Sequence, residues 1–98
     1  MASSQDYLDY VLENLRNLDG ITCKRMMGEY LLYYRGTLFG GVYDNRFLVK
    51  KTKSLEDKGL REVIPYPGAK AMLLVDSESP SEIEELVLAV SADLAAKA

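Results

Sequence analysis

Residues 29–51 read EYLLYYRGTLFGGVYDNRFLVKK, and this stretch decides the fold class. Tyr, Leu, Phe and Val alternate through it with a period of two, which is typical of β-strands. Gly36 and Asp44-Asn45 interrupt the alternation with residues that tight turns prefer. The pattern therefore predicts an antiparallel meander with strands at 29–35, 37–43 and 46–51.

Two further strands are expected beside the meander. Residues 21–27 alternate weakly and add a preceding strand, whereas the apolar run in 69–76 indicates a buried strand. Between the meander and the buried strand, Ser54 is expected to cap a short helix at 55–58 that stops at Gly59.

Helices are predicted at both ends of the chain. Ser3 and Ser4 can each cap a first helix, whose apolar positions recur as far as Leu18 before Asp19-Gly20 end it. Ser79-Pro80-Ser81-Glu82 predicts the start of the last helix, because it combines an N-cap serine, a proline in the first turn and a capping-box glutamate.

Together these elements predict one α+β domain over residues 1–98. It is a two-layer sandwich, in which an antiparallel sheet of about five strands carries the N- and C-terminal helices and one short internal helix on one face. Which sheet face the helices cover stays open, because both faces of the strand at 37–43 are apolar or aromatic. In that strand, regular alternation puts Val42 on the face opposite Phe39.

The composition is that of an ordinary globular domain, with 48% hydrophobic and 28% charged residues. The sequence opens without a basic segment and apolar run of the signal-peptide kind, and it contains no stretch of ~18 apolar residues. One cysteine, Cys23, cannot form an internal disulfide and fits a reducing compartment. We therefore expect a cytoplasmic protein that does not enter the membrane.

Residues that carry chemistry are scarce. The chain has no histidine, which removes the commonest general base and excludes Ser-His-Asp and Cys-His triads. Cys23 would need activation by Lys24 or Arg25 to act as a thiolate, and a small core residue is the commoner role of such a cysteine. We therefore expect no catalytic residues, no metal site and no cofactor, with a small enzyme or ligand pocket as the third hypothesis.

Two motifs inside the meander have more than one interpretation. Gly40-Gly41 lacks the surroundings of a phosphate-binding loop and indicates a β-bulge or a close backbone approach. The strand aromatics lie near several cations and fit either a stacking platform for single-stranded nucleic acid or a core and protein interface. Without an RNP-like motif, the second interpretation is favoured. These aromatics are Tyr30, Tyr33, Tyr34, Phe39, Tyr43 and Phe47.

The net charge of −3 conceals a basic middle of the chain. Residues 24–70 hold ten Lys and Arg against five Asp and Glu, a difference of +5, so the two flanks together carry −8. A basic middle is either a footprint for a polyanion or the solvated face of a sheet. The candidate surface for a partner or for nucleic acid consists of Lys24, Arg25, Arg46, Lys50, Lys51 and Lys53.

Several motifs, taken in order, resemble those of a known family. KRMMGEYLLY at 24–33 resembles a basic-basic-Met-aromatic-Gly-Gly-Tyr-Gly-Leu-Tyr run that characterises the N-terminal domain of TfoX-type competence regulators. RGTLFG at 35–40 is similar to the glycine turn and the apolar strand that follow this run in the family. FLVK at 47–50 is similar to the family's next strand. Met27 stands where an aromatic is usual, and Glu29 and Leu31 stand where glycines are usual. The longer regulators continue into a second helical domain, so the resemblance is to a stand-alone N-terminal module.

The resemblance implies helices on an antiparallel sheet and regulation of DNA-uptake genes together with a cyclic-AMP-responsive transcription activator. In this family the work is thought to run through protein contact, with no catalytic residues to transfer. We therefore expect a non-enzymatic, transcription-linked interaction domain with a protein partner. A second copy of the chain, in a homodimer, is a further candidate partner. The alternative is nucleic-acid binding through the basic strand region, which would weaken steeply with salt.

Overall fold

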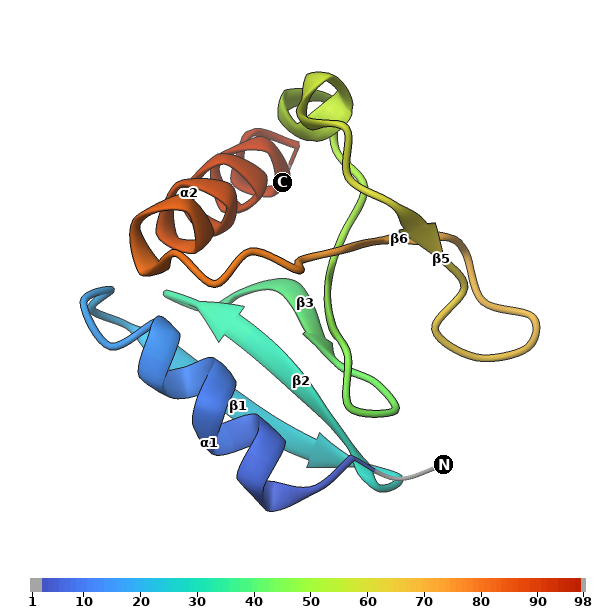
Figure 1. Ribbon diagram of the computed structural model, residues 1–98. Coiled ribbons are helices and arrows are strands. Elements are labelled where there is room, and N and C mark those ends of the chain that lie inside the picture. The colour runs from blue at the N-terminus through green and yellow to red at the C-terminus, as the bar shows by residue number, and fades with distance from the viewer. Residues whose placement is uncertain (1–2, 98) are drawn as a thin grey trace.

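The computed structural model describes residues 3–97 and centres on one antiparallel sheet (Figure 1). The strands are β1 Ile21–Met26, β2 Glu29–Tyr34, β3 Thr37–Val42, β4 Phe47–Val49, β5 Glu62–Val63 and β6 Met72–Leu74. They lie in the order β1-β2-β3-β4-β6-β5. The helices are α1 Gln5–Asn14, the 3₁₀ helix η1 Lys53–Lys58 and α2 Pro80–Ala96. The expected α+β sandwich is confirmed, with β5 as an additional strand.

Three two-residue turns connect the first four strands. Met27-Gly28, Arg35-Gly36 and Asp44-Asn45 have positive φ at both positions, as type I′ turns require. Across the third turn, Tyr43 and Arg46 exchange backbone hydrogen bonds of 2.9 and 3.0 Å. Because turns of this type match the twist of the strands, they fix the register and thereby the face to which each side chain points.

Gly40 and Gly41 follow a β-bulge, as the sequence predicts. The pairing of β2 with β3 shifts register after Leu32, which leaves Phe39 as the extra residue. The extra residue reverses the alternation, so Phe39 and Val42 both belong to the same core. The sequence-based assignment of Val42 to the face opposite Phe39 is therefore wrong.

A side chain at either glycine would collide with the neighbouring backbone. A Cβ atom at Gly40 would overlap the Leu48 carbonyl oxygen of β4, and one at Gly41 would overlap the Tyr30 carbonyl oxygen of β2. Beside Gly41, the Tyr43 ring occupies the remaining space. The two glycines therefore allow the three central strands to approach one another closely.

The core lies between the sheet and the two helices, which are on the same side of it (Figure 1). Among the buried aromatics, Phe39 and Phe47 meet edge to face with ring centroids 6.5 Å apart. The covered sheet face is thus the one that carries Tyr30 and Leu32. From the helices, the core receives Leu8, Val11, Ile83, Leu86, Val87 and Val90.

The first helix differs from its expected form at both ends. Ser4 caps α1 by accepting a hydrogen bond of 3.1 Å from the Tyr7 amide, whereas Ser3 does not cap it. The helix ends at Asn14, before the expected stop at Asp19-Gly20. Beyond Asn14, tighter hydrogen bonds between residues three apart take over and lead the chain towards β1. Within residues 3–97, neither this helix nor any other is long and apolar enough to cross a membrane.

The serine caps of the other two helices are only partly as expected. Ser79 caps α2 by accepting from the Glu82 amide at 3.5 Å, but the Glu82 carboxylate accepts from the Ser77 hydroxyl at 3.0 Å. The capping box is therefore half formed. Ser54 does not cap η1, and its hydroxyl donates to the Asp93 carboxylate of α2 at 2.6 Å. A charged acceptor makes the stronger hydrogen bond, so the expected cap is replaced by a tertiary contact.

Replacing Gly40 by alanine tests the close approach of β3 to β4. We expect Gly40→Ala to lower the free energy of unfolding by roughly 3 kcal/mol or more, because the new methyl group meets backbone that cannot move aside. Gly68→Ala is the control, since Gly68 has a positive φ but open space around it. That variant should lose only about 1 kcal/mol. Equal losses in urea unfolding would contradict the steric explanation.

Candidate functional site

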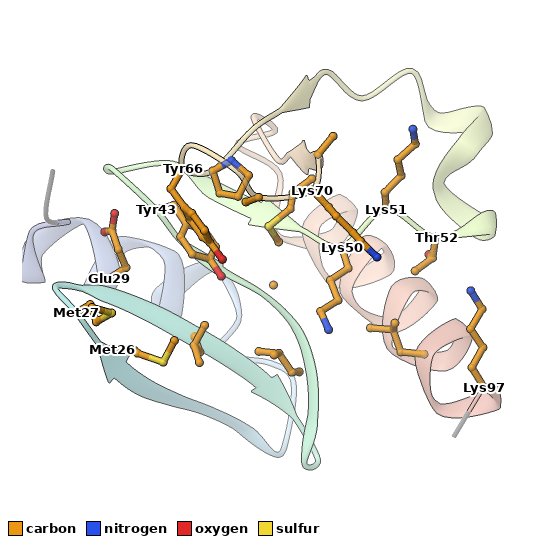
Figure 2. Close-up of a pocket in the computed structure, with 18 residues that line it drawn as sticks. Met26, Met27, Glu29, Tyr43, Lys50, Lys51, Thr52, Tyr66, Lys70 and Lys97 are labelled. Carbon is orange, nitrogen blue, oxygen red and sulfur yellow. The ribbon is translucent and has the colours of Figure 1, made fainter.

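The sheet face opposite the helix-covered core carries an open groove of about 1290 Å³, which the C-terminal end of α2 borders with Leu94 and Lys97 (Figure 2). Its floor is apolar, with Leu31 of β2, Leu38 of β3 and Met72 of β6. Met26 and Met27, at the tip of the β1–β2 hairpin, extend this apolar surface at one end. The Met27 side chain is 95% exposed and the Met26 side chain 50%.

The loop at residues 64–71 forms a second wall of the groove. The Arg46 guanidinium holds this loop, because it donates to the Pro65 carbonyl oxygen at 3.4 Å as well as to that of Tyr43 at 3.1 Å. The Tyr43 and Tyr66 rings pack together with centroids 6.3 Å apart. Leu48 points to this face by strand alternation and is fully buried, so part of the face beside the groove is covered.

The hydroxyl of Tyr43 stays protonated at neutral pH. Burial raises the pKa of this phenol above its ordinary value, and the neighbouring Tyr66 and Glu29 raise it further. Since Tyr43 lines the groove, its hydroxyl is available as a neutral hydrogen-bond donor or acceptor there.

Lysines gather at the other end of the groove (Figure 2). We call Lys50, Lys51, Lys70 and Lys97 the lysine cluster. Lys51 pairs with Glu62 at 3.1 Å, whereas the ion pairs formed within residues 3–97 involve none of the other three. Among the described lining residues Glu29 is the one acid, and it lies at the methionine end. The groove is therefore apolar at one end and positively charged at the other.

The carboxylate of Glu29 is occupied by hydrogen bonds within the protein. One oxygen accepts from the Ser3 amide at 3.0 Å and from the Ser3 hydroxyl at 2.6 Å. The other accepts from the Asp44 amide at 3.0 Å, and the Asn45 amide donates to the Ser3 hydroxyl at 3.0 Å. We call these residues the Glu29 network. It joins the start of α1 to the β1–β2 and β3–β4 turns beside the groove.

A second polar cluster supports the lysine end. Asp93 of α2 accepts from the Ser54 hydroxyl at 2.6 Å and from the Ser54 amide at 2.8 Å. These hydrogen bonds lower the pKa of Asp93 below its ordinary value, and the nearby Lys97 charge lowers it further. The cluster ties η1 to the last turns of α2 and so positions Lys97 beside the sheet.

The structure separates the six cations predicted as a surface. Lys50 and Lys51 line the groove, and Lys53 is exposed at the start of η1. Lys24 and Arg25 are exposed on β1, three strands away from β4. Arg46 is half-buried and bound to carbonyl oxygens. The six therefore do not form one continuous surface.

Sequence reasoning missed half of the lysine cluster. Lys70 stands in a loop, and Lys97 stands in an acidic flank of the chain. Neither has a local signal, because only the fold brings the end of α2 and the 64–71 loop beside β4. A weak signal did mark the other end, where two consecutive methionines precede Gly28 in a turn.

The burial of the strand aromatics and of Cys23 tests two interpretations made from the sequence. Tyr30, Phe39 and Phe47 are buried under the helices, which supports a core role and removes them from any stacking platform. Cys23 is exposed on β1, so its interpretation as a small core residue is wrong. As β1 is an edge strand, the helices leave most of its residues uncovered.

Comparison with known proteins identifies similar chains. The family model described as the TfoX N-terminal domain matches residues 13–96. A protein of Spirochaeta aurantia, described as an uncharacterized 12.7 kDa protein in the trpE 5′ region, is 31% identical over 100 residues. That match covers 98% of this chain and 87% of the relative.

Removing the Glu29 carboxylate tests the Glu29 network. We expect Glu29→Ala to lower the free energy of unfolding by roughly 2 kcal/mol, since charge-assisted hydrogen bonds to Ser3 and Asp44 are lost. Glu13→Ala is the matched control, because Glu13 forms an exposed pair with Arg16 at 3.6 Å. The control should change stability by less than about 0.5 kcal/mol. Similar losses in both variants would contradict the proposed network.

Acid unfolding tests the Asp93 cluster. A carboxylate whose pKa is lowered in the folded state stabilises the fold above its ordinary pKa, and this contribution disappears as the pH falls through the lowered value. Wild type should therefore lose stability from about pH 4 downward, relative to Asp93→Asn. Asp93→Asn should be the less stable at pH 7. A difference in stability between wild type and Asp93→Asn that stays constant from neutral to acidic pH would contradict this. Asp57→Asn on η1 serves as the control.

Proposed function

The chain belongs to the TfoX N-terminal domain family, and on this premise we propose that it is a non-enzymatic domain that regulates transcription by contacting another protein in the cytoplasm. The groove carries the proposal, because it places exposed apolar side chains next to cations. Exposed apolar patches bordered by polar or charged residues are typical of protein interaction sites.

The residues of the groove support a role without catalysis. The chain has no histidine to act as a general base. The carboxylate of Glu29 is already engaged by Ser3 and Asp44. Cys23 lies on β1 and is not among the lining residues.

Nucleic-acid binding is the second candidate, favoured by the positive charge of the lysine cluster. It ranks second because Lys24 and Arg25 lie three strands from β4 and because Tyr30, Phe39 and Phe47 of the expected stacking platform are buried, which leaves Tyr43 and Tyr66 as the aromatics of the groove. A homodimer formed through the β1 edge is disfavoured in the same way. Lys24 and Arg25 of one copy would lie near the same residues of the other copy and repel them.

A pull-down from nuclease-treated native lysate tests the proposal. We expect wild type to enrich a transcription protein, and Lys50→Glu/Lys70→Glu to lose most of it, about tenfold, as expected for reversed interface charges. Lys53→Glu/Lys58→Glu changes the charge equally on exposed residues of η1 outside the groove and should retain the partner. If all bound material disappears with nuclease, nucleic-acid binding replaces the proposed function.

A further inference from the structure

The two ends of the groove differ in chemistry, and this difference restricts what can occupy it. Figure 2 shows the methionines and Glu29 at one end and the lysine cluster at the other, with Tyr43 and Tyr66 along one side. An occupant must therefore present apolar groups to the first end and negative charge to the second. The net charge of the chain is −3, so the positive charge of the lysine cluster is opposite in sign to that of the protein as a whole.

The methionine end exposes apolar surface on a strained backbone. Met27 is 95% exposed and occupies the first position of a type I′ turn with φ 53°, where Asn or Gly is preferred. A bulky residue at positive φ costs stability, and such strain is concentrated at sites that bind. Methionine side chains also adapt readily to differently shaped apolar partners.

At the lysine end, cations are available to a partner. Lys50, Lys70 and Lys97 form no ion pair with any residue in 3–97, although the Asp93 carboxylate lies close enough to Lys97 to interact with its charge. Lys51 pairs with the exposed Glu62. Glu29 lies at the opposite end of the groove, where its oxygens accept hydrogen bonds from Ser3 and Asp44, and it pairs with none of these lysines. The cluster therefore attracts carboxylates.

From this complementarity we propose that the groove binds a short peptide segment of the partner protein, in which apolar side chains stand next to Asp or Glu. The apolar side chains lie on Met26, Met27 and Leu31, and the carboxylates reach the lysine cluster. This inference rests on the proposed function and specifies the part of the partner that is recognised. A nucleic-acid strand fits less well, because its phosphates would have to follow the groove past the methionines while the lysines occupy one end only.

Selection from a phage-displayed library of random peptides tests the inference. We expect the selected sequences to combine apolar residues with Asp or Glu. The affinity of one selected peptide is then measured by titration calorimetry, and Lys50→Glu/Lys70→Glu should weaken it by about tenfold or more. Lys53→Glu/Lys58→Glu should stay within about twofold of wild type, because exposed charges outside an interface contribute little.

Met27→Gly separates binding from folding. Glycine accepts the positive φ of this turn, so the variant should be at least as stable as wild type while it loses the exposed apolar side chain. We expect it to weaken the peptide several-fold, by about three to ten times.

Three results of the peptide experiments would overturn the inference: selected peptides without carboxylates, a peptide whose affinity is unchanged by both groove variants, or a single-stranded oligonucleotide that displaces the peptide from the groove. A captured protein that stays bound after nuclease treatment and binds Lys50→Glu/Lys70→Glu and Met27→Gly as well as wild type would also overturn it. Protein contact would then stand as the function, but through a surface other than the groove. Failure of the proposed function is recognised separately, by loss of all captured protein after nuclease.

Discussion

The close approach of β3 to its neighbours at Gly40 and Gly41 is the constraint on which both sides of the sheet depend. Because neither residue has a side chain, the backbones of β2, β3 and β4 can close around the bulge at Phe39. On the helix side, the bulge directs the side chains of both Phe39 and Val42 into the same core. On the other side, the missing side chains leave Gly40 as part of the groove floor and give the Tyr43 ring its place.

Most of the fold could be predicted because its signals are local. The alternation in residues 29–51, the residues at the tight turns and the Ser79-Pro80 helix start each act within a few positions of sequence. The features that were missed depend on distant partners or on very short segments. Ser54 meets Asp93 across 39 positions and so leaves its own helix uncapped, and β5 spans only two residues. The Gly40-Gly41 pair indicates a bulge, but the one-residue register shift that decides the face of Val42 depends on the pairing with β2 and has no local signal.

The candidate site was predictable only in part. Lys50 and Lys51 follow an apolar strand directly, so they stood out in the sequence, whereas Lys70 and Lys97 join them only through the packing of the loop and α2. Arg46 drew attention by its charge, but in a half-buried position its guanidinium serves backbone carbonyl oxygens. Glu29 departs from the glycine usual in the family, and its side chain connects three segments that a glycine could not hold together.

The tight turns and the strand order have a consequence for how the chain folds. Each of the first three hairpins closes over two residues, so little chain entropy is lost when neighbouring strands pair. β6 is inserted between β4 and β5 and must arrive from beyond η1 and the 64–71 loop. During synthesis, β1 to β4 therefore emerge first, and the outer edge of β4 stays unpaired until residues 72–74 leave the ribosome. In that interval, the unpaired edge of β4 is exposed to pairing with another chain.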